Sequence, residues 1–357
     1  MAPRPSFARI ALVLTAACAP LLAQTPLFTD GTVFGGSKVF SEGLNPLGNP
    51  ARTPKATDGY YFTYLDGDQE AKDAESSIDN SSSTDPSTAS SALVKLGNSP
   101  WALRTRAYGL VAIKQGTSLA LTHEELTGIL ATPDLTPADL GNPGVANNTS
   151  LLDVRRANVT RLNVGGGSQA QQGMTLGGNM RIERWSMGEQ RLSYNNPGPN
   201  FGSTSSTLLG FSGSSPDTYT YGIDLGMAME LAQGVRLGLT ADQINAKRLW
   251  DVDLKPQARA GLQIDLGQWA MVTVESDLNS AERMPFPVKQ QATAGSIRFS
   301  LNPSVVLLVG AEQRKIDDAS VTRGGATLQI RTQSLLLSLG FQAGQDRPMK
   351  SATVGFF

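Results

Sequence analysis

The sequence predicts an all-β protein, a closed antiparallel transmembrane β-barrel of about 14 strands. Three features indicate this fold. Apolar and polar side chains alternate with a period of two in segment after segment, as expected when successive strand side chains point to opposite faces. Several segments reach the roughly 9–11 residues that a tilted strand needs to cross a bilayer. Short turns alternate with longer connections, as in outer-membrane barrels.

Composition narrows the function classes before any motif is considered. The chain has 357 residues, with 30 Lys and Arg against 31 Asp and Glu. Nucleic-acid binding depends on clustered positive charge, so this balance argues against a nucleic-acid partner. A single His and a single Cys leave little material for a transition-metal site or a disulfide framework. We therefore expect no metal, no cofactor and no enzymatic activity.

Residues 1–23 have the pattern of a secretory signal peptide. Arg4 and Arg9 form a basic region, residues 10–19 are apolar, and Ala23 is a small residue at the expected cleavage point. The apolar run is shorter than the roughly 20 residues of a transmembrane helix. The sequence thus predicts an exported chain in three parts, namely the signal peptide 1–23, an N-terminal segment 24–58 and a barrel 59–357.

The second half of the chain carries the clearest strand pattern. Between 219 and 231, large apolar side chains alternate with small or charged ones, so one face of the strand is apolar and the other is polar. The alternation is weaker at 154–164 and 207–212. The predicted strands are 60–65, 101–114, 117–122, 154–164, 174–183, 207–212, 219–231, 235–242, 257–265, 269–278, 292–301, 304–313, 325–331, 334–342 and 350–357.

The connections between these strands differ in length. We expect short turns at 233–234, 267–268 and 302–303, and long connections at 243–255, 279–289 and 316–324. Two more long loops are predicted at 66–99 and 124–150. The first begins acidic and becomes Ser-rich, which is typical of a mobile segment. Inside the second, Thr136 and Pro137 favour one helical turn, because Pro suits the first helical position.

All four tryptophans lie at or beside predicted strand ends. This placement suits an aromatic girdle at the two membrane interfaces. A soluble sheet with Trp at its edges fits the same positions equally well. The four residues are Trp101, Trp185, Trp250 and Trp269.

Three sequence segments resemble one known family. They are the Gly-Asn-Pro-Ala stretch at 48–51, the acidic stretch at 64–69 that follows an aromatic strand, and the segment 235–261. Together they resemble the TraF-like conjugal-transfer proteins of the bacterial outer membrane. That family is similar to the FadL-type fatty-acid transporter barrels and to the PorV-type secretion barrels.

The resemblance implies a fold, a location and a set of partners. The barrel would have about 14 strands, with residues 24–58 folded into the lumen as a hatch that contains Asn49, Pro50 and Ala51. The terminal Phe357 would be read by the barrel assembly machinery, although Thr353 and Gly355 weaken that signal. Outer-membrane lipid would surround the barrel. Its further partner would be a small hydrophobic ligand or an envelope-complex protein, and no catalytic site is implied.

Charged side chains occur on the polar faces of the predicted strands. In a barrel these residues would line the lumen, pair with one another and set selectivity, whereas in a soluble sandwich they would face water. The candidates are Arg181, Glu183, Asp224, Glu230, Arg236, Asp242, Arg259, Asp265, Arg298 and Arg331.

Three other groups of residues are candidate sites. His123 could serve as the general base of an outer-membrane lipid hydrolase, but no G-x-S-x-G motif accompanies it. The acidic residues Asp66, Asp68 and Glu70 lack the rest of a calcium loop, so we expect a solvated loop. The Gly run at 165–167 lacks the helix that a phosphate loop needs and is expected to be a flexible turn.

Two functions from different classes follow. The first is an outer-membrane barrel that transports small or hydrophobic substrates or supports an envelope transfer or secretion system. The alternative is a soluble, exported β-sandwich with a binding or adhesion role. The barrel is favoured because the export signal, the strand lengths, the turn alternation and the terminal Phe357 agree with one another.

Overall fold

The computed structural model describes residues 37–40, 48–67, 71–81, 83–97, 101–135, 149–171, 173–193, 216–317, 319–343 and 349–357. The predicted signal peptide, the helical turn at Thr136 and the strand at 207–212 lie outside these ranges. So do Asp68 and Glu70.

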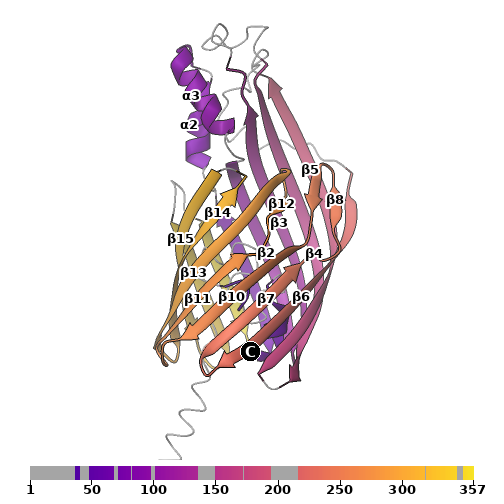
Figure 1. Cartoon of the computed structure of the whole chain (residues 1–357), viewed down its shortest axis with the longest axis vertical. Helices are drawn as coiled ribbons and strands as arrows, with labels where there is room; N and C mark the ends of the chain where they lie inside the picture. The colour runs from indigo at the N-terminus through magenta and orange to yellow at the C-terminus, as the bar shows by residue number, and fades with distance from the viewer. Residues whose placement is uncertain are drawn as a thin grey trace, which may run out of the picture.

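Within the described residues, fifteen strands form one antiparallel sheet, and the pairing of β11 with β13 closes fourteen of them into a barrel (Figure 1). The short strand β12 pairs with β13 beyond the end of β11. Closure confirms the predicted barrel and is incompatible with a two-sheet sandwich. The barrel strands are β1 (Gly59–Gly67), β2 (Trp101–Lys114), β3 (Thr117–Thr132), β4 (Leu151–Gln171), β5 (Met174–Ser193), β6 (Thr218–Ala232), β7 (Val235–Asp242), β10 (Gln257–Asp265), β11 (Ala270–Asp277), β13 (Val288–Asn302), β14 (Val305–Ile316), β15 (Ala319–Arg331), β16 (Leu335–Ala343) and β17 (Met349–Phe356).

The two ends of the barrel differ. Short turns and the last residue of the chain lie at one end, which we call the turn end. Helices α2 (Ala71–Ser81) and α3 (Pro86–Gly97) stand at the opposite end, the helix end (Figure 1). A separate hairpin of β8 (Lys247–Leu249) and β9 (Val252–Leu254) and the strand β12 (Ala281–Arg283) belong to connections at the helix end.

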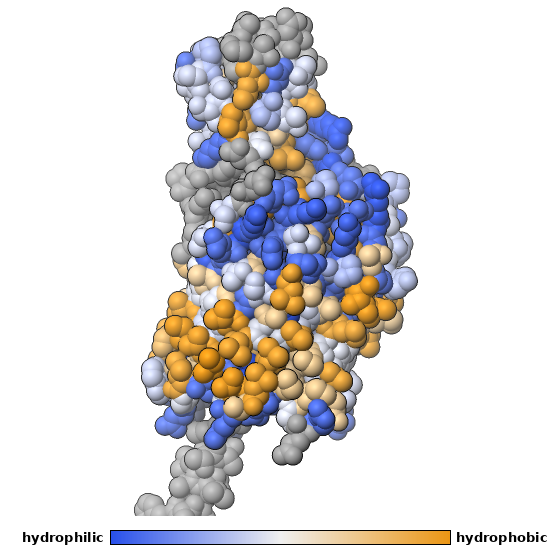
Figure 2. Space-filling view, viewed as in Figure 1, coloured by the Kyte–Doolittle hydropathy of each residue, from blue (hydrophilic) through white to orange (hydrophobic). Residues whose placement is uncertain are grey.

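Alternation places apolar side chains outside the barrel and polar ones inside. On β6, Tyr219 and Tyr221 are 69% and 61% exposed, whereas Asp224 is 1% exposed. Figure 2 shows the resulting band of apolar side chains across the lower part of the visible face of the barrel, with polar side chains above it. Strand side chains alternate by two, so a one-residue shift would have placed Asp224 outside.

The segment 66–99 is not the expected mobile loop, because it contains α2 and α3. Asp85 begins α3 as its N-cap and accepts a hydrogen bond from the Thr88 amide at 3.0 Å. Leu93 and Leu96 lie on the buried side of α3, and α3 contacts β3. Regular apolar spacing within the Ser-rich stretch thus produces a helix with one buried face.

Two other expected connections are strands. Segment 316–324 contains the end of β14 and the start of β15, which pair in continuous register from Ile316 and Ala319. The predicted loop at 124–150 begins as strand, because β3 continues to Thr132 against β4. The Gly run at 165–167 lies inside β4 and is not a turn. In each case, pairing with a neighbouring strand outweighs the local preference for a turn.

Candidate functional site

A short N-terminal segment lies inside the barrel. We call residues 37–40 and 48–55, including the 3-10 helix η2 (Pro50–Lys55), the luminal segment. Asn49 caps this helix, because its Oδ1 accepts from the Ala51 amide at 3.0 Å. Its Nδ2 donates to the carbonyls of Val39 at 2.8 Å and Met227 at 3.0 Å. Asn49 therefore joins both parts of the luminal segment to β6.

Glycines on the inner wall make room for the luminal segment. A Cβ at Gly177 would overlap Pro50 and Ala51, and a Cβ at Gly226 would overlap Asn49. The backbone of the segment therefore approaches the wall more closely than any side chain would allow. Three neighbouring strands repeat the arrangement with Gly167, Gly238 and Gly261.

The first part of the luminal segment is also held by charged groups. Ser37 Oγ donates to Glu275 Oε2 at 2.6 Å, and the Val39 amide donates to the same oxygen at 3.2 Å. Lys38 forms an ion pair with Asp242. Glu275 is in turn bound by Arg259 at 2.9 Å. Each buried charge thus has a partner of opposite sign, as burial requires.

A second ion-pair network crosses β3, β4, β5 and β6. Arg161 contacts Glu124 at 2.7 Å and Glu183 at 3.2 Å. Arg181 contacts Asp224 at 2.9 Å. All five side chains are at most 7% exposed. Paired charges of both signs therefore line this part of the lumen.

The ten predicted lumen charges do not share one environment. Arg181, Glu183, Asp224, Arg259 and Arg298 are buried inside the barrel. Asp242 pairs with Lys38, and Arg236 pairs with Asp265 at 2.8 Å near the turn end. Arg331 donates to Thr57 Oγ1 at 3.1 Å. Glu230 is exposed near the end of β6 and forms no ion pair with another described residue.

Several network residues were missed at the sequence level. Glu275 and Asp277 share the polar face of the predicted strand 269–278, so the same alternation identifies both. Both faces of 154–164 mix apolar and polar residues, so alternation does not single out Arg161. Glu124 falls in a segment expected to be a loop. Lys247 reaches Glu183 from the β8–β9 hairpin, and no periodicity in the sequence marks that contact.

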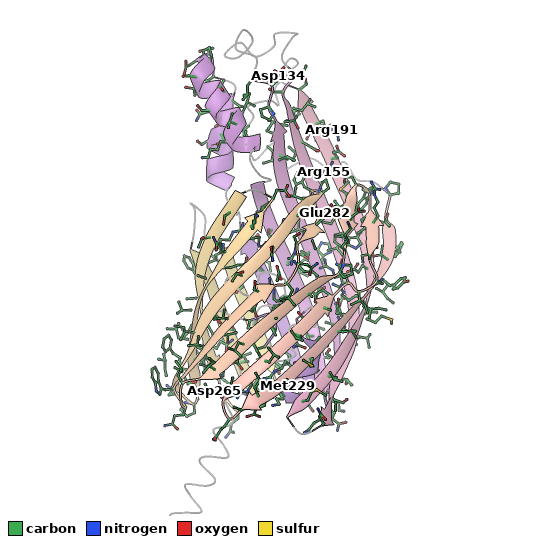
Figure 3. The ribbon with its side chains drawn as sticks, in the orientation of Figure 1. Asp134, Arg155, Arg191, Met229, Asp265 and Glu282 are labelled. Carbon is green, nitrogen blue, oxygen red and sulfur yellow. The ribbon has the colours of Figure 1, made fainter. Side chains whose placement is uncertain are left out.

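The β8–β9 hairpin folds over the helix end of the lumen. Its buried residues Leu249, Val252 and Leu254 join a cluster that includes Trp185 and Met284. Asp251 at its tip forms an ion pair with Arg155 at 2.8 Å, and the Asp253 amide donates to Glu282 Oε2 at 2.7 Å. Figure 3 shows Arg155 and Glu282 toward the helix end and Asp265 and Met229 toward the turn end.

The tryptophans do not form one girdle. Trp185 is buried in the lumen, where its Nε1 donates to Glu183 and Arg161 lies 5.3 Å from its ring. Trp250 lies in the turn of the β8–β9 hairpin and packs on the cluster around Trp185. Trp269 is exposed at the turn end and stacks on Phe299. Trp101 begins β2.

A cavity of about 120 Å³ lies beneath the β8–β9 hairpin. Its apolar wall is formed by Leu126, Trp185, Leu254 and Met284. Its polar wall includes Arg161, Arg181, Asp242 and Lys38. The ion-pair networks, the luminal segment and the hairpin therefore meet around one space, which we take as the candidate site.

Other predicted residues lie elsewhere. Phe357 turns inward, where its ring contacts Tyr61 at 5.9 Å and Arg331 at 4.6 Å.

His123 stacks on Tyr108, and its Nδ1 lies 2.9 Å from Thr160 Oγ1. Asp66 faces Arg106 at 3.6 Å. Within the described ranges, no group of three His, Cys, Asp or Glu side chains is placed to hold a metal ion.

Comparison with known proteins supports the fold. No protein-family model matches, and no curated protein matches. The toluene transporter TodX of Pseudomonas putida is similar in structure, with a TM-score of 0.56 and 12% sequence identity. The toluene transporter TbuX of Ralstonia pickettii gives a TM-score of 0.56 and 10% identity. Each alignment covers 94% of this chain and 98% of the other.

These solved structures bear out the closed antiparallel β-barrel that the sequence predicts, and at this level of identity they concern the fold alone. The helices within the described residues are too short or too polar to span a bilayer.

Proposed function

We propose that this chain is an outer-membrane barrel through which small molecules with an apolar body cross the membrane. The observation that carries the proposal is the pairing of an apolar exterior with a polar interior on a closed barrel. Lipid-facing and lumen-facing residues alternate in this way along the strands of outer-membrane barrels.

The exterior belt supports a membrane location. Large apolar side chains are widely exposed on neighbouring strands, for example Tyr60 at 67%, Leu121 at 55% and Met180 at 51%. Soluble proteins rarely expose a continuous apolar patch larger than a few hundred Å². In a bilayer the same side chains would contact acyl chains, and the tyrosines would lie near the interfaces.

The interior supports passage of a small molecule. The cavity inside the barrel is lined by the apolar side chains of Leu126, Trp185, Leu254 and Met284 and by eight charged side chains. The apolar group gives a small molecule with an apolar body a surface to contact within an otherwise polar lumen. The comparison barrels are described as toluene transporters, which favours a cargo with an apolar body over an ion or a sugar.

The proposal has a two-step test. Purified protein in detergent is first run on gels with and without boiling, and the folded barrel should migrate differently from the boiled chain. Intact bacterial cells that make the protein in their outer membrane, and matched cells that do not, are then exposed to radiolabelled toluene and to a small sugar. We expect faster uptake of toluene by the cells that make the protein, and no acceleration for the sugar.

A variant in the belt separates insertion from transport. Leu262→Arg places a charge among lipid tails, which costs about 2–4 kcal/mol near the bilayer centre, so it should reduce insertion. Gln263→Glu also introduces a charge, but on the adjacent, inward-facing residue, where it keeps an acceptor for Arg236, so it should insert normally. If the protein is monodisperse in buffer without any amphiphile, the membrane proposal is wrong.

A second role follows from α2 and α3. These helices stand beyond the barrel at the helix end (Figure 1), where they can be reached by another envelope protein, as the TraF-like resemblance implies. A photo-crosslinking amino acid at Val94, which is 37% exposed, would test this in cells. A crosslinked product that forms from Val94 but not from the exposed Leu301 at the turn end, together with toluene passage that is retained after deletion of 71–97, would support a separate docking role.

A further inference from the structure

We propose that the cavity beneath the β8–β9 hairpin binds small aromatic carboxylates, with the ring on its apolar wall and the carboxylate on Arg283 at its rim. The inference rests on the proposed function, because it names the chemical class of the cargo. Such a ligand keeps the apolar body that the proposed function requires and adds one negative charge. The argument uses the size of the cavity, two rim cations without an acidic partner, and the unequal burial of rim and wall.

The size of the cavity limits the ligand. Its volume of about 120 Å³ is of the order of the roughly 150 Å³ apolar cavity that holds benzene in another protein. One ring therefore fits, whereas a second ring or a long acyl chain does not. The restriction is built from both sides, since Leu254 comes from the hairpin and Leu126 from β3.

The apolar wall suits a flat ring. Trp185, Leu254 and Met284 belong to one buried cluster, and Leu126 packs against it. An indole and a thioether both make favourable contacts with an aromatic ring. The wall alone would hold a hydrocarbon and a substituted ring in the same way, so any choice between them depends on the charged residues of the lining.

Two cations at the rim of the cavity have no acidic partner. Arg283 and Lys255 line the cavity, and neither forms an ion pair with another described residue. The other three cations of the lining each contact an acid, namely Lys38 with Asp242, Arg161 with Glu124, and Arg181 with Asp224. A ligand anion can therefore bind at the rim without displacing an internal ion pair.

Arg283 is held in place by a neutral side chain. Its Nη2 donates to Oε1 of Gln257, and Nε2 of Gln257 donates to Oδ2 of Asp277 at 3.0 Å. Within the described residues, this is the one hydrogen bond of the Arg283 side chain. An amide oxygen orients the guanidinium but does not neutralise it. Other N–H groups of the guanidinium remain for a carboxylate, with which arginine forms charge-assisted hydrogen bonds.

Glu282 is the one acid next to these two cations in the lining. Its Oε2 accepts from the Asp253 amide at 2.7 Å, which ties it to the hairpin. Figure 3 shows Glu282 toward the helix end. With Arg283 and Lys255 counted against Glu282, the rim keeps an excess of positive charge, so it attracts an anion and repels a cation.

The unequal burial of neighbouring residues sets the orientation of the ligand. Leu254 and Met284 are 5% and 8% exposed, whereas the adjacent Lys255 is exposed and Arg283 is half-buried. The ring would therefore lie inward and the carboxylate would lie at the rim, where it keeps part of its water. A charge that stays partly hydrated avoids most of the desolvation cost of full burial.

Three compounds provide the test: p-toluate, p-toluamide and biphenyl-4-carboxylate. The amide has nearly the shape of p-toluate without its charge, and the biphenyl acid adds a second ring. Each is titrated into the purified, folded chain in detergent at pH 7, and tryptophan fluorescence follows binding. Trp185→Phe supplies the background, because Trp185 is the tryptophan of the described lining. We expect a Kd for p-toluate about tenfold lower than for p-toluamide, and no saturable binding of the biphenyl acid.

Matched arginine variants identify the group that binds the charge. Arg283→Gln removes the rim charge but keeps an amide that Gln257 can bind, so it should raise the Kd of p-toluate about tenfold and leave that of p-toluamide unchanged. Arg248→Gln is the control, since it changes the net charge equally on a residue whose ion-pair partner Asp253 lies in the same hairpin. Gel migration before and after boiling confirms that each variant is folded.

The outcomes separate this inference from the proposed function. Binding of p-toluamide as tight as that of p-toluate, an unchanged preference in Arg283→Gln, or no Trp185-dependent signal overturns the inference even if cells that make the protein take up toluene faster. Selective binding of p-toluate that is lost in Arg283→Gln supports it. If p-toluate binds selectively but neither it nor toluene enters the cells faster, the cavity assignment stands and the transport proposal fails.

Discussion

Lys247 on the β8–β9 hairpin forms an ion pair with Glu183 on β5, and Glu183 is also 3.2 Å from Arg161. This contact joins the hairpin to the buried network of the lumen. Burial lowers the pKa of Lys247, while the neighbouring Glu183 acts in the opposite direction. The Lys247–Glu183 ion pair and the contact between Asp251 and Arg155 together give the hairpin two polar attachments above the cavity.

Removal of the Lys247 attachment should open the hairpin more often. Lys247→Met keeps the length of the side chain, and Glu183 retains its arginine partners, so we expect a loss of about 1–2 kcal/mol in hairpin closure, or roughly a tenfold rise in the open population. The measurement is the rate at which a polar maleimide labels a thiol introduced by Leu254→Cys, in a chain whose single natural Cys18 is replaced by Ser.

Arg248→Gln is the control for this change, because Arg248 is exposed on the same hairpin and its ion-pair partner is Asp253 within the hairpin. It should leave the labelling rate unchanged. Equal labelling in Lys247→Met and the parent would show that the apolar cluster alone holds the hairpin closed.

The glycine wall predicts a sharp difference between two neighbouring residues. Gly177→Ala would push a methyl group into Pro50 and Ala51, whereas a Cβ at Gly178 has nothing nearer than 3.8 Å. Overpacking typically costs 1–3 kcal/mol, so Gly177→Ala should lower the thermal midpoint of the barrel by several degrees in a gel-shift melting series. Gly178→Ala should stay close to the parent.

If the two alanine variants melt together, the luminal segment does not pack on β5 as described. A digestion experiment gives an independent reading, because a displaced segment should be cut by trypsin at Arg52 or Lys55 before the barrel strands are.

The barrel could be predicted from the sequence because its dominant signal is local. The alternation of Tyr219 and Tyr221 with Asp224 survives in the structure as outside and inside positions. Strand length and turn spacing carry the same information. The barrel is closed by the pairing of β11 with β13. No sequence feature beyond the strand pattern is needed to predict this closure, because a sheet of long strands removes its exposed edges by closing.

The interior could be predicted only in part, because its partners come from distant segments. Trp185 shares its face of β5 with Arg181 and Glu183, so the alternation places it in the lumen. That it belongs to a buried apolar cluster depends on the hairpin that carries Leu249 and Val252. The sequence of the Gly run at 165–167 is typical of a turn. The structure gives another reason for glycine there, because Pro50 of the luminal segment lies against Gly167. The helical part of 66–99 depends on a buried face that β3 supplies.

Asn49 should be the most sensitive residue of the luminal segment. Asn49→Ala removes three hydrogen bonds and leaves the carbonyls of Val39 and Met227 inside the barrel without this donor. We expect a loss of about 1–3 kcal/mol, seen as faster trypsin cleavage within 48–55. Asn302→Ala is the control, because Asn302 accepts from Ser304 in an exposed turn. Equal cleavage of the two variants would contradict the anchoring role.

The start of α3 should respond to acid. Hydrogen bonds from the Thr88 and Ser87 hydroxyls and from the Thr88 amide lower the pKa of Asp85 from 3.8 to about 2. A carboxylate whose pKa is lowered by folding stabilises the helix above its unfolded pKa, and that contribution is lost as the pH falls from about 4 to about 2. Amide exchange at Thr88, relative to amides near Leu96, should therefore quicken over this interval in the parent. Asp85→Asn retains a capping side chain but does not titrate, so its Thr88 exchange should show no such step. A step of equal size in Asp85→Asn would assign the acid response to another group.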